Sequence, residues 1–250
     1  MLQLQGENTR RLRLALLATV TVFFLGCVAT VPDTARVRDA EIPNYKVGGH
    51  RVEEAIDLYI EPQIRNLHAN VRPRSESEDF YPIPVIVGPA LEKALVSMTR
   101  QYFSKVTPVE EPEDRPTLTY KLLTYRPVVS VEPGANSTRL NVSARLALQV
   151  SIDSANGEEL FSTTAIGTSH VSDTKLAAGT GLKDAPGLLE VATRNAIIDA
   201  MYDISSIFGN SNDMIYAEVL ASEIDPEFGI EKIDDVVLNL RTRRKKSAGD

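Results

Sequence analysis

The sequence is poor in the residues from which most metal and disulfide centres are built. It contains one cysteine, Cys27, and three histidines, His50, His68 and His170. No two histidines lie four residues apart and none stands beside other ligands, so the spacing of a zinc site is missing. A single thiol cannot form an internal disulfide, so a hydrophobic core has to hold the fold. We therefore predict no metal site and no cofactor.

Recognisable catalytic motifs are missing as well. The chain has no GxSxG or HExxH, and the glycines of residues 179–187 lack the GxxxxGK[ST] spacing that cradles phosphate groups. Adjacent carboxylates, such as those at residues 53–54 and 234–235, are more typical of solvated charge than of an acid–base couple. A catalytic triad assembled from distant residues stays open as an alternative. We therefore predict no catalytic residue and a protein that is not an enzyme.

Basic residues are in the minority. Lys and Arg number 27 and Asp and Glu number 34, for a net charge of −7, which excludes a general nucleic-acid binder. The exception is the tail, residues 241–250, which holds five basic residues and one acidic residue. This tail has too little apolar surface to order itself. It is suited to anionic lipid head groups, to the chain's own acidic surface, or to solvent alone.

The one long apolar run lies near the start of the chain and ends at the cysteine. Three arginines among residues 10–13 precede the 12 apolar residues 14–25, and Gly26 stands directly before Cys27. This order is typical of a secretory signal peptide. The run is shorter than the roughly 20 residues that span a bilayer. An uncleaved anchor over the 18 uncharged residues 14–31 is the alternative.

The end of the run resembles a bacterial lipoprotein signal. Residues 24–27, FLGC, keep the Gly-Cys of the lipobox but have Phe for the usual Leu and Leu for the usual small residue. The resemblance implies that residues 1–26 are removed and that Cys27 becomes an acylated N-terminus, anchored in membrane lipid. Val28 stands where an aspartate would imply retention in the inner membrane. We therefore expect an outer-membrane lipoprotein that faces the periplasm.

The rest of the chain predicts one domain with appendages. Residues 27–50, which contain prolines and a Gly-Gly pair among polar residues, predict a flexible tether. Residues 51–210 predict the periplasmic domain, and residues 211–250 predict a C-terminal extension that includes the basic tail.

The clearest strand covers residues 140–152, in which apolar and polar side chains alternate. Such alternation is typical of a sheet with one buried and one wet face. The Asn156-Gly157 pair predicts a hairpin turn to a return strand over 159–171, and residues 117–131 predict the preceding strand. The predicted inward residues are Leu140, Val142, Ala144, Leu146, Leu148, Val150 and Ile152, and the outward ones are Asn141, Ser143, Arg145, Gln149 and Ser151.

Two amphipathic helices flank these strands. The first is predicted over residues 88–104, with an apolar stripe every three or four residues, and the second runs from Asp184 to about Phe208, with Gly209 as its stop. Residues 54–60 and 64–71 predict extended segments, and residues 72–84 a loop. We predict an α+β fold in which the two helices pack on one face of an antiparallel sheet.

Three segments, followed by the closing amphipathic helix, carry a resemblance to a loose group of bacterial envelope lipoproteins. They read AIDLYIEP, IVGPALEKALVSMTRQYFSKV and RLNVSARLALQVSIDSANGEELF. Over residues 54–208 the chain resembles the small YajG-type proteins and the auxiliary lipoproteins of ABC transporters. The resemblance implies a non-enzymatic binding or assembly module of an envelope protein complex, and carries over no functional residue except Cys27. The alternative is a tethered periplasmic hydrolase with an unrecognised site.

Overall fold

The computed structural model describes residues 33–45, 52–75, 80–112, 115–134, 137–176 and 181–223. The chain divides into two compact units, Met1–Val31 and Pro32–Asp250, and every described residue belongs to the second unit. Cys27, the predicted signal peptide and the basic tail lie outside the described residues.

Five strands form the larger sheet, in the order β5–β2–β6–β7–β8. They are β2 (Val52–Ile60), β5 (Phe103–Val109), β6 (Thr117–Pro133), β7 (Ser137–Asp153) and β8 (Glu159–Leu176). β6, β7 and β8 form an antiparallel meander, whereas β2 runs parallel to both β5 and β6. The sheet is therefore mixed, and the prediction of an antiparallel sheet is wrong at β2. A parallel pair needs a long crossover, which the helix between β2 and β5 supplies.

A smaller sheet has the order β1–β4–β3. Its strands are β1 (Ala35–Arg36), β3 (His68–Val71), which follows the single turn α2 (Pro62–Arg65), and β4 (Ile83–Ile86). β1 lies inside the predicted tether and β4 at the end of the predicted loop. For these residues the two predictions are wrong, because pairing with residues far along the chain outweighs the local Pro and Gly content.

The chain just after β1 also lies against the domain. The Tyr45 N–H donates to Gln101 Oε1 at 3.0 Å, and Gln101 Nε2 donates to the Pro43 carbonyl at 3.1 Å. The Tyr45 ring meets Tyr202 edge to face, with 5.7 Å between the ring centroids. Residues 33–45 are therefore part of the domain rather than of a tether.

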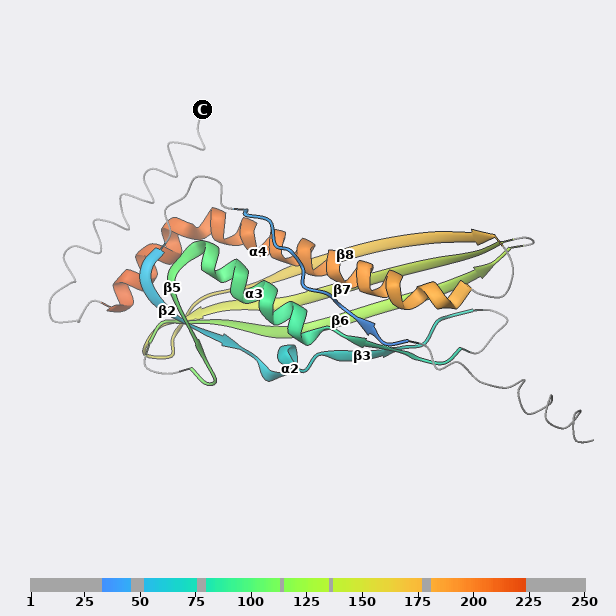
Figure 1. Ribbon diagram of the computed structural model, residues 1–250. Helices are drawn as coiled ribbons and strands as arrows, with labels where there is room; N and C mark the ends of the chain where they lie inside the picture. Colours follow the sequence, from blue (N-terminus) through green and yellow to red (C-terminus); the bar gives the residue numbers. More distant parts are fainter. Residues whose placement is uncertain are drawn as a thin grey trace, which may run out of the picture. The chain divides into compact units, whose positions relative to one another are not determined.

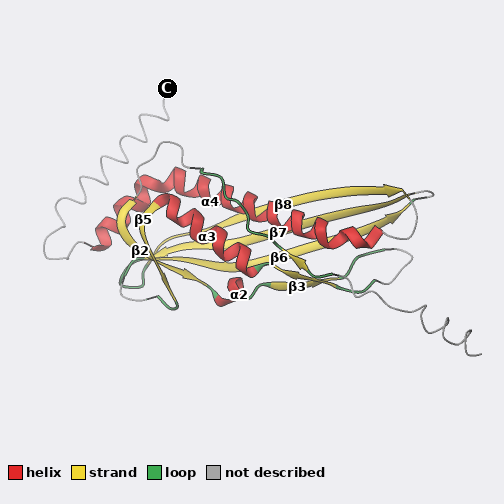
Figure 2. Ribbon diagram, in the orientation of Figure 1, coloured by secondary structure: helices red, strands yellow, loops and turns green. Residues whose placement is uncertain are grey.

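Two long helices lie over one face of the larger sheet (Figures 1 and 2). α3 (Gly88–Tyr102) packs against β2, β5 and the second helix, and α4 (Ala185–Glu223) runs along β7 and β8. α3 matches its prediction to within two residues. α4 continues through Gly209, so the predicted stop is wrong. One glycine costs a helix only about 1 kcal/mol, and although the Asn, Ser and Asp of residues 210–213 are poor helix formers, residues 214–223 include Met, Ala, Glu and Leu, which are good ones.

The core lies between the helices and the sheet. The inward side of the alternation predicted for β7 is confirmed, because its seven residues, named above, are each at most 2% exposed, whereas Ser151, predicted to face outward, is buried. Leu91, Leu95 and Met98 of the α3 stripe are buried as well, and α4 adds Leu189, Ile197, Met201 and Phe208. In the turn between β7 and β8, Gly157 alone has a positive φ, of 77°.

Candidate functional site

The face of β6–β8 that points away from α4 is solvent-exposed along most of its length. We call it the open face and define it by four rows of side chains that pair across the three strands. The rows are Arg126–Arg145–Thr168, Val128–Ser143–His170, Ser130–Asn141–Ser172 and Glu132–Arg139–Thr174. Of the outward residues predicted for β7, Asn141, Ser143 and Arg145 lie in these rows, whereas Gln149 and Ser151 lie farther along the strand and Ser151 is buried.

Arg126 and Arg145 are directly opposite each other on the open face. Both side chains are exposed. Side chains in such positions have Cβ atoms about 5 Å apart, and like charges there destabilise the sheet. Within the described residues no carboxylate forms an ion pair with either guanidinium. The site therefore holds two adjacent positive charges that the described protein leaves uncompensated.

Arg74 extends this basic cluster from a separate segment. Its N–H donates to the Val129 carbonyl and its carbonyl accepts from the Val131 N–H, both at 2.8 Å. This bridge to β6 pairs Arg74 with Ser130, so Arg74 lies on the same face as Ser130. The backbone bonds hold the segment firmly along the edge of β6.

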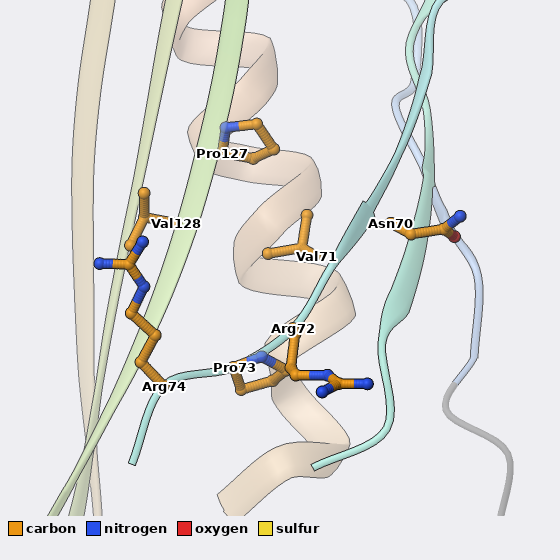
Figure 3. Close-up of a pocket in the computed structure, with 7 residues that line it drawn as sticks. All are labelled: Asn70, Val71, Arg72, Pro73, Arg74, Pro127 and Val128. Atoms are coloured by element: carbon orange, nitrogen blue, oxygen red, sulfur yellow. The ribbon is translucent and has the colours of Figure 1, made fainter. Parts of the chain in front are cut away.

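A pocket of about 360 Å³ opens between this segment and β6. Figure 3 shows the Arg74 side chain running along β6 to Val128, and Pro127 and Val71 also line the pocket. Val71 and Pro73 are buried and Arg72 and Arg74 are exposed. The remaining lining residue is Asn70. The pocket therefore has an apolar wall and a basic rim that continues the open face.

Acidic groups gather at the other end of the sheet. Asp153 is paired across the strands with Thr117 and Glu159. Burial first, and then the nearby Glu159 carboxylate, raise the pKa of Asp153, while Lys121 works in the opposite direction. Asp57 is buried beside them, 3.8 Å from an Arg115 nitrogen. The charges of the sheet are thus separated along its length.

Two carboxylates of α4 occupy part of the β8 edge. Asp203 Oδ2 accepts the Ile166 N–H and Asp199 Oδ2 accepts the Thr168 N–H, each at 2.8 Å. Asp199 and Asp203 are four residues apart, so they lie on one face of the helix. An exposed edge strand is a template for pairing with other chains, and charged groups placed at it limit such pairing.

The next outward amides of β8 belong to His170, Ser172 and Thr174, because outward N–H groups recur at every second residue of a strand. Among the described residues none accepts a hydrogen bond from these three amides. We call them the free edge of β8.

The sequence-predicted residues are spread over the fold. His68 is exposed on β3 and His170 on the open face, while His50 and Cys27 lie outside the described residues, so lipidation of Cys27 stays a prediction. Nowhere in the described ranges do three His, Cys, Asp or Glu side chains come together as metal ligands. Of the helices described, none has the length and apolar character to cross a membrane.

Sequence reasoning placed Arg145 on a wet face but missed its opposition to Arg126. The register of β6 shifts at an irregularity between Leu122 and Thr124, and a shift of one residue exchanges the two faces of a strand. No residue type in that stretch signals the irregularity. The bridge made by Arg74 depends on an equally remote contact.

No family model matches this chain. No curated protein matches it either. Among solved structures it is similar to a Xanthomonas campestris protein of the family DUF330, with 12% identity, coverage of 74% of this chain and 98% of that one, and a TM-score of 0.37. It is also similar to a minor lipoprotein from Acinetobacter baumannii, with 13% identity, coverage of 65% of this chain and 96% of that one, and a TM-score of 0.36. A third similar structure is the rare lipoprotein B from Shewanella oneidensis, with 13% identity, coverage of 65% of this chain and 99% of that one, and a TM-score of 0.32. Likenesses this weak carry no argument about function.

Proposed function

We propose that this protein is a membrane-tethered periplasmic lipoprotein that serves as a binding or assembly module of a cell-envelope complex. Its anchor is the acylated Cys27 in the outer membrane, as the FLGC signal implies. The observation that carries the binding role is the edge of β8. Two of its amides are closed by Asp199 and Asp203, and the free edge beyond them is open.

Part of the β8 edge is bonded to Asp199 and Asp203, and part is free. This arrangement supports binding of a specific partner segment rather than pairing with any exposed strand. An extended segment of another protein can add to a sheet edge, where main-chain hydrogen bonds give affinity and side-chain pockets give specificity. The carboxylates at Ile166 and Thr168 stop such a segment from pairing along the whole strand. The partner segment is therefore confined to the end of β8 that starts at His170.

An acylated Cys27, linked through residues 28–32 to the docked residues 33–45, would raise the concentration of the free edge near one membrane. A linked module meets its partner as if the two were at millimolar concentration when the linker can span the distance. Residues 28–32 and 46–50, on either side of the docked residues 33–45, are outside the described part of the chain. The function in cells should therefore need both the lipid at Cys27 and the free edge.

A proline in the free edge tests this function. Ser172→Pro removes one outward amide of an edge strand, a position that proline can occupy without loss of a ladder hydrogen bond. Ser172→Ala is the matched control, because it changes the side chain but keeps the amide. Complexes are cross-linked in the envelope, solubilised in detergent and identified by mass spectrometry.

We expect the same envelope protein to co-purify with the wild type and Ser172→Ala, and to be lost with Ser172→Pro. Thr174→Pro provides a second position if Ser172→Pro lowers the melting temperature. Equal recovery of that protein with proline at both positions would contradict pairing at the free edge. Loss of the complex in Cys27→Ser, with the soluble chain still abundant, would support the need for the tether.

A further inference from the structure

We propose that the open face docks on a membrane surface rich in anionic phospholipid head groups, with Arg126 and Arg145 holding the phosphates. The inference deepens the proposed function and rests on it for the membrane to which the domain is tethered. It names a second binding surface of the module, distinct from the free edge of β8.

The charge of the open face runs against that of the whole chain. The face carries Arg126, Arg139 and Arg145, joined by Arg74, and one carboxylate, Glu132, for a formal charge of +3. The complete chain has a net charge of −7. Basic residues are outnumbered by acidic ones in this chain, so a random distribution would not be expected to place four arginines together. Binding of an anionic partner would account for the cluster.

Apart from Glu132, the acidic groups among the described residues are poorly placed to neutralise this cluster. Asp153 lies eight residues from Arg145 along β7, a distance of about 27 Å in a strand. Charges farther apart than a Debye length, about 8 Å at physiological ionic strength, are largely screened from each other. Asp199 and Asp203 are at the β8 edge, where they accept hydrogen bonds from β8 amides, and among the described residues neither forms an ion pair with Arg126 or Arg145.

The opposed arginine pair favours phosphate as the bound group. A guanidinium presents its N–H groups as a planar fork that matches the oxygens of a phosphate. A phosphate between Arg126 and Arg145 would replace their mutual repulsion by two attractive contacts. The rows beside the pair carry hydroxyl side chains, of which Ser130 and Ser143 are half-buried and add hydrogen-bond donors at the same surface, while Asn141 Nδ2 donates to Glu132 Oε1 at 2.7 Å.

Exposed aliphatic side chains beside the pair favour a lipid surface over a free anion. Ile166, 39% exposed, is two residues from Thr168 in the Arg126–Arg145 row, and Leu123, 52% exposed, lies at the β6 irregularity. Peripheral membrane proteins combine apolar groups that enter the head-group boundary with basic groups that bind anionic lipids. The short side chains of the central rows leave a flat bilayer free to approach both arginines.

Vesicle flotation tests the proposal with the unit Pro32–Asp250, which is compact without the N-terminal residues. The vesicles contain phosphatidylcholine with or without phosphatidylglycerol. We expect binding only to the phosphatidylglycerol vesicles, and Arg126→Gln with Arg145→Gln to weaken it by about 25-fold, since each basic residue near an anionic surface is worth about fivefold. The matched control is Arg100→Gln with Lys183→Gln, which removes the same charge from exposed positions outside the open face.

Equal loss of binding in both double variants would overturn the proposal, because only net charge would then matter. Binding that ignores phosphatidylglycerol would overturn it as well. Displacement from vesicles by millimolar inorganic phosphate would identify a free-anion site instead of a membrane surface. For the full chain in mixed micelles, we expect phosphatidylglycerol to raise the melting temperature of the wild type but not that of the arginine double variant.

The two proposed binding surfaces, the open face and the free edge of β8, can be tested independently of each other. Ser172→Pro should bind phosphatidylglycerol vesicles as the wild type does, because it leaves the open-face arginines in place. The arginine double variant should still co-purify with the envelope protein after cross-linking. Failure of vesicle binding with an intact complex would sink the lipid inference alone, and the reverse result would sink the edge-pairing function alone.

Discussion

The backbone of Gly167 on β8 lies against the backbone of Ala196 on α4. A Cβ atom at residue 167 would stand 1.9 Å from the Ala196 carbonyl oxygen and 2.5 Å from the Ala200 nitrogen. The obstructing atoms are backbone atoms, so no side-chain rotation can relieve the contact. The approach of the long helix to the edge strand therefore depends on the absence of a side chain at this position.

Gly167→Ala should lower the free energy of unfolding by about 2–3 kcal/mol or more, the usual cost of overpacking that shifts backbone. Denaturant unfolding measures the change. Gly187→Ala is the control, since a Cβ there meets nothing within 4 Å and alanine is a better helix former by up to about 1 kcal/mol. If Gly167→Ala left the free energy of unfolding unchanged while Gly187→Ala raised it, α4 would not approach β8 this closely.

Leu148 in the centre of β7 should be a main contributor to stability. Its side chain is 0% exposed, and Leu148→Ala should cost about 2–5 kcal/mol through lost burial and the cavity left behind. Leu123→Ala, at an exposed position, should cost under about 1 kcal/mol. Unfolding in urea compares the two variants, and equal costs would show that the register of the meander is wrong.

Asp153 should make stability depend on acid pH. Burial and the Glu159 carboxylate raise its pKa in the folded protein, so the folded state holds a proton that the unfolded state has already released. Stability from this group therefore falls as the pH rises through the range above about 4, the ordinary pKa of aspartate. Asp153→Asn should be more stable than the wild type at pH 7, and the gain should vanish below pH 4. Thermal unfolding across this range checks the sign.

Asp199 and Asp203 should keep the protein from associating through β8. Replacing both by alanine exposes the Ile166 and Thr168 amides, which then join the free edge as a longer template for strand pairing. Sedimentation velocity should show dimers or larger species whose amount rises with concentration. The double asparagine variant keeps a side-chain carbonyl acceptor at each position and should remain closer to the wild type.

Cys27 should carry the lipid. Cells fed a radioactive fatty acid should label the wild type and leave Cys27→Ser unlabelled, because no other residue of the chain offers a thiol. Label that persists in Cys27→Ser would refute the lipoprotein interpretation. Because Val28 follows the cysteine, the labelled protein should fractionate with outer-membrane markers rather than inner-membrane ones.

The sequence was sufficient to predict the elements whose buried residues follow a regular pattern along the chain. β7 alternates from Leu140 to Leu146, since one of its faces meets α4 and the other meets water, and α3 repeats its apolar residues with the helical period. Both patterns depend only on neighbours along the chain. The α+β class, the meander and the first helix follow from them.

The sequence was insufficient where pairing is remote. β1 pairs with β4 about 50 residues later, and β2 lies between two strands that come after it in the chain. The local sequence of neither β1 nor β2 predicts which strand it pairs with. For the same reason only part of the open face could be predicted from the sequence. Arg145 belongs to an alternating strand, so its outward position was predictable. The positions of Arg126 and Arg74 depend on the irregular register of β6 and on a single β-bridge.

The position of β2 also sets an order of assembly. Its neighbours, β5 and β6, are made after it, so residues 52–60 have no partner in the larger sheet until residues 103–109 are available, and no second partner until residue 120 is. The meander β6–β8 needs only short connections and can form by itself, whereas pairings between distant residues form slowly because a long loop must close first. We therefore expect folding to proceed from the later strands back to the earlier ones, which would leave the N-terminal strands without their native partners for longest.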